Sequence, residues 1–277
     1  MLNQRMSAVM SFCFACLVSF FTTSMTVHAE EQGKVADFIE KSRVVLDVTY
    51  ASKYLGRRGV DYFGNGAAIH PTAQLFLADT GLYLGISGAT PFEDKCTDPF
   101  GGKCADWVEY DYFIGHSKTF LEETPLKTTY LASYMYISFP KVFRQDLQQL
   151  ELKFTHTDLL PKLGPSKPSL YWGLYYTWRA QGRGLDIREF LLGLSYDLPV
   201  ASKTVNLFVD GIWDSGPGGF VKEKGLTRIR TGASTNFAWE GFNFRPEIYY
   251  QSKMKRTNPE SWLESEFWVR FSVSYAF

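Results

Sequence analysis

The chain has 277 residues, of which 45% are hydrophobic and 17% aromatic, and it carries 29 basic and 29 acidic side chains. So aromatic a composition excludes a disordered chain, and the balanced charge argues against a nucleic-acid surface as a partner. The mean hydropathy is −0.16, and no run of about 18 apolar residues follows residue 29, so no transmembrane helix is expected. A β-barrel stays compatible with these values, because its strands are apolar only at alternate positions.

Residues 1–29 have the features of a secretory signal peptide. They hold one charge, Arg5, followed by an apolar stretch over residues 8–21 and a small-residue cleavage pattern that ends at Ala29. We expect cleavage after Ala29, which leaves 28 basic and 29 acidic side chains on the exported chain. Retention of the segment as an uncleaved anchor is the alternative.

Residues 30–41 follow as a short periplasmic segment, either a helix or an irregular lead-in, and residues 42–277 form the main domain. Twelve segments of alternating hydrophobicity, separated by turn residues, occupy this domain. They span 43–53, 70–78, 82–90, 106–118, 128–139, 147–157, 169–180, 188–198, 203–213, 227–238, 241–251 and 265–277. The sequence therefore predicts an all-β fold, a closed antiparallel transmembrane β-barrel of about twelve strands with both termini in the periplasm.

The connections differ in length at the two ends of this barrel. Four connections face the periplasm. Those at residues 79–81 and 239–241 are tight turns, and those at 119–127 and 158–168 are longer. The outward-facing connections are 54–69, 91–105, 140–146, 181–187, 214–226 and 252–264. Long loops outside and short turns inside are typical of outer-membrane barrels.

Two cysteines remain after the signal peptide, Cys96 and Cys104, both in the second outward-facing connection. In an oxidising compartment so close a pair favours a disulfide that closes a small loop. Metal ligation is the alternative, but no His or further Cys lies nearby and a zinc site needs about four ligands. We expect no metal site and no cofactor, since the glycine-rich stretches at 182–184 and 216–219 lack a phosphate-binding Gly-Lys-Ser/Thr ending.

The last strand ends the chain at an aromatic residue and has two distinct faces. Its apolar face, expected to contact lipid, consists of Phe267, Val269, Phe271, Val273, Tyr275 and Phe277. A terminal phenylalanine on such a strand also predicts recognition by the outer-membrane assembly machinery. Pro246 falls on the lipid-facing parity of the preceding strand, where a ladder N–H is needed, so a β-bulge is expected there.

Charged residues gather on the opposite parity, which predicts a water-filled lumen. The candidate pore-lining residues are Asp47, Glu109, Asp111, Glu151, Arg188, Asp210, Arg228, Arg230, Arg245, Glu247 and Arg270. Arg228, Arg230, Arg245 and Arg270 lie on neighbouring strands and could form a basic wall that acids of the first half face. A transverse field of this kind favours small polar or charged solutes over apolar ones.

These features predict a porin-like channel for passive diffusion in the outer membrane of a Gram-negative bacterium, with membrane lipid and small polar solutes as its partners. One alternative is that the charges pair across the lumen and plug it, which leaves a structural barrel or an adhesin whose outer loops bind a partner. A lipid hydrolase is a further alternative. It is disfavoured because His116 and Ser117 point to opposite faces, His156 lies toward the periplasmic end and His70 has no serine two residues away.

Three motifs between residues 48 and 118 add a family resemblance. They are Ser52-Lys-Tyr-Leu-Gly-Arg-Arg-Gly59, Gly81-Leu-Tyr-Leu-Gly-Ile-Ser-Gly88 and Glu109-Tyr-Asp-Tyr-Phe-Ile-Gly115. The first, with one extra residue before Arg58, resembles the first-strand signature of the TorF-type porin family, and the other two are similar to its third strand and its Glu-x-Asp-x-x-x-Gly strand. The resemblance implies an outer-membrane barrel whose substrate is poorly defined.

Overall fold

A computed structural model describes residues 38–53, 66–92, 109–140, 146–181, 186–215, 225–254 and 265–277. Cleavage after Ala29 and the Cys96–Cys104 disulfide were predicted for residues outside these ranges. Residues 38–41 form one helical turn ahead of the first strand. No helix among the described residues is long and apolar enough to cross a membrane.

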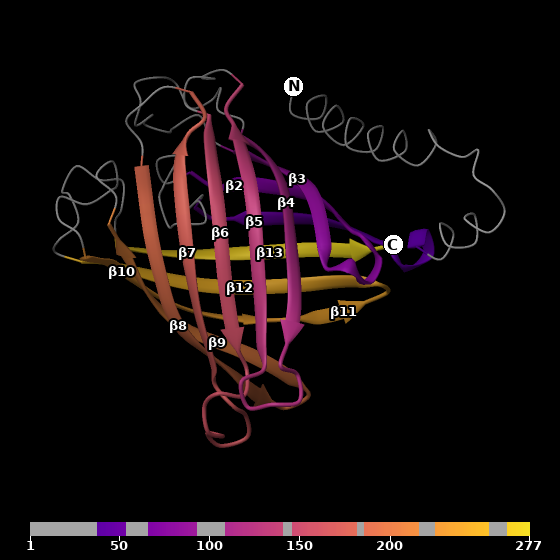
Figure 1. Cartoon of the computed structure of the whole chain (residues 1–277), viewed down its shortest axis with the longest axis vertical. Helices are drawn as coiled ribbons and strands as arrows, with labels where there is room; N and C mark the ends of the chain where they lie inside the picture. Colours follow the sequence, from indigo (N-terminus) through magenta and orange to yellow (C-terminus); the bar gives the residue numbers. More distant parts are fainter. Residues whose placement is uncertain are drawn as a thin grey trace.

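Thirteen strands make up a single sheet in the described part of the chain (Figure 1). They are β1 (Arg43–Ala51), β2 (Ala68–Phe76), β3 (Leu82–Pro91), β4 (Glu109–Phe120), β5 (Thr128–Ser138), β6 (Leu147–His156), β7 (Ser169–Arg179), β8 (Asp186–Val200), β9 (Lys203–Asp214), β10 (Gly225–Thr235), β11 (Phe237–Trp239), β12 (Phe242–Lys253) and β13 (Glu266–Ala276). One 3₁₀ turn, η1 (Ala78–Thr80), joins β2 to β3.

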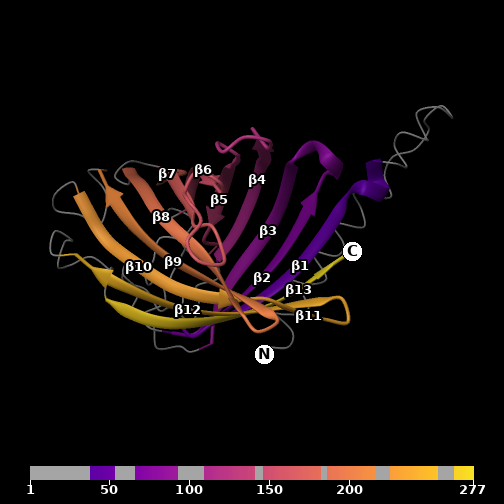
Figure 2. The ribbon, with the colours of Figure 1, turned by 90° about the horizontal axis from the view of Figure 1, so that it is seen from below.

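The sheet closes on itself, and its neighbouring strands pair antiparallel. β1 pairs with β13 over seven residue pairs, from Val45 opposite Ala276 to Ala51 opposite Arg270. Figure 2 shows the first and last strands, β1 and β13, side by side. β12 pairs with the other edge of β13, and β10 pairs with the other edge of β12. In Figure 1 strands β5 to β7 run across β12 and β13, as expected for the tilted strands of a barrel. The predicted closed antiparallel barrel is confirmed.

The strands number twelve once β10 and β11 are counted together. Both pair with β12 in one continuous register, Ser234 opposite Glu247 and Phe237 opposite Phe244. The ladder between them is interrupted opposite Pro246, which has no N–H to donate. The bulge predicted at Pro246 is therefore wrong, because pairing with β13 also continues through it, to Phe271. A short break in one ladder accommodates the proline instead.

The actual irregularity of this region lies at Thr227. Leu226 pairs with Trp213 and Arg228 pairs with Ile212, so Thr227 is an extra residue on β10. Its hydroxyl donates a hydrogen bond of 3.0 Å to the carbonyl oxygen of Ile212. A bulge re-aims side chains, and here Thr227 and Arg228 are both fully buried.

Glycines on the inner face of the wall are covered by aromatic rings from neighbouring strands. A Cβ at Gly115 would overlap the ring of Tyr83, and a Cβ at Gly193 would overlap the ring of Tyr171. Tyr83 and Tyr171 each belong to a small buried apolar cluster on the inner face. The missing side chains thus make room for rings that stabilise the curved sheet.

The two ends of the barrel differ, and we name them the turn end and the loop end. The turn end holds the C-terminus and the connections 77–81, 121–127, 157–168, 201–202 and 240–241. Glu240 and Gly241 have φ values of 48° and 83°, as a tight two-residue hairpin turn requires. The loop end holds the other six connections, each of which includes residues outside the described ranges.

Candidate functional site in the barrel lumen

The barrel wall has an apolar outer face and a mixed, largely polar inner face. On β13, Phe267, Val269 and Phe271 are 54, 39 and 40% exposed, whereas Glu266 and Trp268 are 5% exposed. The same alternation puts Leu46, Val48 and other large apolar side chains on the outside of β1. The predicted facing of the last strand is confirmed.

Ten of the eleven candidate pore-lining residues lie on the inner face. Along each strand, these residues alternate with exposed apolar side chains of the outer face. Several of the ten side chains are buried. These ten are Asp47 on β1, Glu109 and Asp111 on β4, Glu151 on β6, Asp210 on β9, Arg228 and Arg230 on β10, Arg245 and Glu247 on β12, and Arg270 on β13.

Arg188 is the exception, and its predicted position in the lumen is wrong. It pairs with the outward-facing Tyr176, and its exposed guanidinium lies 5.6 Å from the centre of that ring. The inner face of β8 is occupied by Ile187 and Glu189, which are 2 and 4% exposed. The sequence could not decide the facing of β8, because Arg188 and Glu189 place one charge on each side of the strand. The apolar residues that follow them also occupy both sides.

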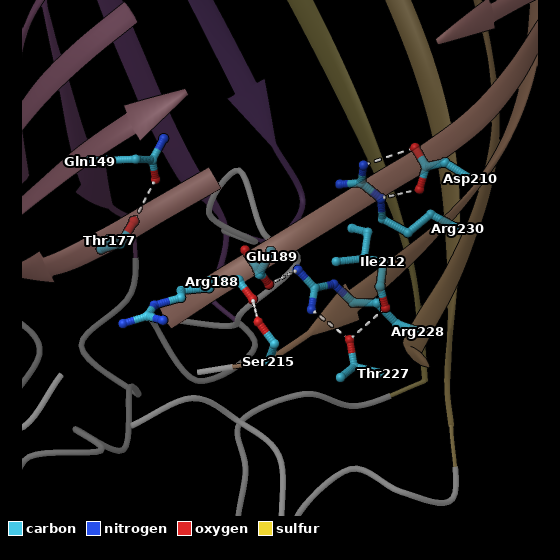
Figure 3. A network of polar contacts seen from close by, with 10 residues as sticks. All are labelled: Gln149, Thr177, Arg188, Glu189, Asp210, Ile212, Ser215, Thr227, Arg228 and Arg230. Atoms are coloured by element: carbon cyan, nitrogen blue, oxygen red, sulfur yellow. Dashed lines mark hydrogen bonds and ion pairs between the residues drawn. The ribbon is translucent and has the colours of Figure 1, made fainter. Parts of the chain in front are cut away.

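Glu189 is a lumen residue that the sequence prediction missed, and it binds Arg228. The distance from Arg228 Nη2 to Glu189 Oε1 is 2.8 Å, and both side chains are buried (Figure 3). Arg228 Nη1 also donates to Thr227 Oγ1 at 3.2 Å. This pair belongs to the loop end of the lumen, because β8 and β10 both begin there.

Arg230 is held on the wall by Asp210 of the neighbouring strand. Its Nε and Nη2 donate to the two carboxylate oxygens of Asp210 at 2.9 Å each (Figure 3). The Tyr171 hydroxyl donates to the same carboxylate at 3.1 Å. A bidentate fork of this kind fixes the guanidinium in one orientation. The ion pairs of Arg228 and Arg230 thus link strands β8, β9 and β10 of the wall.

Arg245, Glu247 and Arg270 form a different arrangement, which we name the lumen triad. Arg245 Nη2 lies 2.9 Å from Glu247 Oε1, and Arg270 Nε lies 3.7 Å from Glu247 Oε2. The Glu247 side chain is 4% exposed, whereas Arg245 and Arg270 are 47 and 40% exposed. The triad thus holds two accessible cations around one buried carboxylate, and Asp47 on β1 lies close enough to interact electrostatically with all three groups.

We expected acids of the first half of the barrel to face the basic wall, and Asp47 on β1 interacts electrostatically with two of its four arginines, Arg245 and Arg270. The ion pairs of the four arginines lie elsewhere. Their carboxylate partners are Glu189, Asp210 and Glu247, which lie on β8, β9 and β12. Asp111 and Glu151 accept hydrogen bonds from Ser87 and Ser133 at 3.0 and 3.4 Å. Ion pairing thus runs along the wall in the last third of the barrel.

A layer of buried polar side chains lies at the loop end of the lumen. We name it the loop-end layer, and each member is at most 6% exposed. It comprises Glu109, Gln149, Thr177, Glu189, Asp214, Thr227, Arg228, Gln251 and Glu266. The lumen is consequently more accessible to water at the triad than at this layer.

No protein-family model and no curated protein sequence matches this chain. Among solved structures, the barrel is similar to a KdgM porin, with a TM-score of 0.50 and 8% identity, over 84% of this chain and 99% of that chain. It is also similar to a NanC porin, with a TM-score of 0.50 and 10% identity, over 83% of this chain and 98% of that chain. At these identities the likeness is one of fold.

Proposed function

We propose that the chain is an outer-membrane porin-like channel through which small polar or charged solutes diffuse passively. The lumen triad carries this proposal, because Arg245 and Arg270 are 47 and 40% exposed inside the barrel. A structural plug has no need of half-exposed cations, whereas solutes in a pore would meet them. The fold likeness to two porins supports the same function.

The outer face supports the placement in a membrane. Aromatic side chains stack on it near both ends of the strands, as in the pairs Tyr176–Trp178 and Phe154–Trp172. Leu174, which lies between these two pairs on β7, is 48% exposed. An apolar band between two aromatic girdles matches the hydrocarbon and interfacial regions of a bilayer. We assign the turn end to the periplasm and the loop end to the exterior.

The two exposed guanidinium groups of the triad favour anionic over cationic solutes, because solutes in the lumen meet them more readily than the buried Glu247. In a narrow lumen with low-dielectric walls, fixed charges raise the local concentration of the opposite ion. Lumen substitutions in such barrels tune selectivity, whereas outer-face substitutions act on insertion.

The test is conductance of the refolded mature chain in a planar bilayer under a potassium chloride gradient. We expect discrete steps and a reversal potential that favours chloride, reduced in the double variant Arg245→Ala with Arg270→Ala. Arg188→Ala is the matched control, since it removes an arginine from the outer face and should leave the reversal potential unchanged. Equal selectivity in all three proteins would contradict the role of the triad.

The loop-end layer favours a second candidate, a barrel closed at that level whose outer loops bind a partner. A folded, heat-modifiable barrel without conductance would support that candidate. The lipid hydrolase alternative gains nothing from the described histidines of the outer face. His116 bonds to the hydroxyl of Tyr130, and His156 bonds to Thr128 and Trp172.

A further inference from the structure

Both arginines of the lumen triad keep N–H donors that the described residues do not use. The nearest carboxylate oxygen to Arg270 is Glu247 Oε2, which lies 3.7 Å from Nε and is thus beyond hydrogen-bond length. Arg245 approaches Glu247 with one nitrogen, Nη2, at 2.9 Å. A guanidinium has more donors than these contacts occupy. The remaining donors are available to a solute in the lumen.

Asp47 provides an acceptor next to these donors. Its side chain lies on the inner face of β1 and is half-buried. Oδ1 accepts a hydrogen bond of 2.8 Å from Thr49 Oγ1, whereas Oδ2 accepts none from the described part of the chain. Asp47 therefore offers one carboxylate oxygen to a solute.

The two kinds of group belong to one patch of the lumen, because β12, β13 and β1 lie side by side (Figure 2). Arg245 lies opposite Ser272, which in turn lies opposite Thr49. The hydroxyl oxygens of Ser272 and Thr49 are 2.7 Å apart. A pair of hydroxyl groups thus joins the anionic side of the patch, at Asp47, to its cationic side.

Glu247 holds the two guanidinium groups but is not itself offered to a solute. Its side chain is 4% exposed, and its two oxygens lie nearest to Arg245 and Arg270. Oε1 also accepts a hydrogen bond of 2.7 Å from the Tyr249 hydroxyl. The charges that a solute meets are therefore those of Arg245, Arg270 and Asp47.

The separation of these charges suits a small solute. Asp47 lies two residues along the strand direction from the level of Arg245, about 7 Å, and two strand spacings away, about 10 Å. The long arginine side chain shortens the gap, and the two groups interact electrostatically. A simple anion meets the guanidinium groups but is repelled by Asp47, and a simple cation is attracted only by Asp47. A solute that carries both charges satisfies both sides.

We propose that the lumen binds small zwitterions of the α-amino acid class, with the carboxylate at Arg245 and Arg270 and the ammonium group at Asp47. The proposal rests on the channel function proposed above, since it names a solute class for the same lumen. Guanidinium groups match the geometry of a carboxylate, and a carboxylate oxygen accepts the N–H of an ammonium group.

The test is saturation-transfer NMR of the full mature barrel, refolded in detergent and titrated at neutral pH with L-alanine, propionate or ethylammonium. Propionate lacks the ammonium group of alanine, and ethylammonium lacks its carboxylate. We expect the wild-type chain to bind L-alanine about fivefold more tightly than propionate, the effect of one exposed ion pair. Ethylammonium should bind more weakly still, because it loses both guanidinium contacts.

Four variants separate the two sides of the patch. Asp47→Asn keeps an acceptor for Thr49 but removes the charge, so it should bind L-alanine no more tightly than propionate. Asp47→Glu restores a carboxylate and should regain the preference for L-alanine. Arg270→Gln should weaken the binding of both L-alanine and propionate. Asp158→Asn removes a carboxylate from a turn outside the lumen, so it is the matched control and should bind as the wild type does.

Equal binding of L-alanine and propionate by the wild-type chain would overturn the proposal, and this comparison needs no variant. An unchanged preference for L-alanine in Asp47→Asn, shown to be folded by heat-modifiable migration, would also overturn it. Conductance is a separate measurement. A barrel that conducts without preferring L-alanine would remove the zwitterion site and keep the channel, whereas a barrel that prefers L-alanine without conducting would keep the site and remove the channel.

Discussion

The guanidinium of Arg228 on β10 lies 2.8 Å from the carboxylate of Glu189 on β8, and neither side chain is accessible to water. Removing one partner leaves the other charge buried without compensation, which costs about 3–5 kcal/mol. We expect Glu189→Ala to lower the free energy of unfolding by about this amount. Urea unfolding of the barrel in lipid vesicles, followed by tryptophan fluorescence, measures it.

The double variant Glu189→Leu with Arg228→Met is the control for this pair. It removes both charges, so it should be more stable than Glu189→Ala. Its loss of unfolding free energy should also be smaller than the sum of the losses in the two single variants. Single variants as stable as the wild type would show that the pair does not support the loop end of the barrel.

Glu247 offsets one of the two positive charges in the lumen triad. Glu247→Gln keeps the size of the side chain and an oxygen that can accept the 2.7 Å hydrogen bond from Tyr249. Loss of the negative charge should therefore increase the preference for anions, seen as a larger reversal potential under a salt gradient. Glu122→Gln, a change in an exposed turn, should have no effect. An unchanged reversal potential in Glu247→Gln would place the triad outside the conduction path.

Strand faces could be predicted from the sequence wherever one face was clearly apolar, as on β13. Prediction failed at Arg188, because Arg188 and Glu189 are successive charges near the start of β8 and the apolar residues after them occupy both faces. The partner of Arg228 could not be predicted either. Glu189 lies 39 residues away, on a strand two places along the sheet, and the extra residue Thr227, which also donates to Ile212, could not be predicted. Register and bulges depend on tertiary pairing, which a period-2 pattern does not encode.

Gly193 on β8 gives the ring of Tyr171 its place on the inner face. A larger residue at this position must push the ring away, and such overpacking costs about 1–3 kcal/mol. We expect Gly193→Val to destabilise the barrel by this amount in the urea measurement. Gly88→Ala is the control, because a Cβ there would meet its nearest neighbour at an ordinary 3.4 Å. Equal stability of the two variants would contradict the packing role of the glycine.

Asp158 and Lys167 join the two ends of the turn between β6 and β7, with 2.7 Å between Lys167 Nζ and Asp158 Oδ1. The hydrogen bond from Lys167 holds the pKa of Asp158 below its usual value. Because the pKa is lowered in the folded state, this stabilisation is present above the ordinary aspartate pKa and is lost as the pH falls through the lowered pKa. Both groups are at the surface, so added salt should weaken the effect.

Lys167→Ala should therefore return the pKa of Asp158 toward the ordinary value, measured by carboxyl carbon NMR as a function of pH. Lys162→Ala removes a cation from the same turn and should shift the Asp158 titration less, since Lys167 is the donor to this carboxylate. The global stability of the barrel should barely change in either variant, because an exposed ion pair contributes little. If Asp158 titrates alike in the wild type and Lys167→Ala, the turn is not held together by this ion pair in solution.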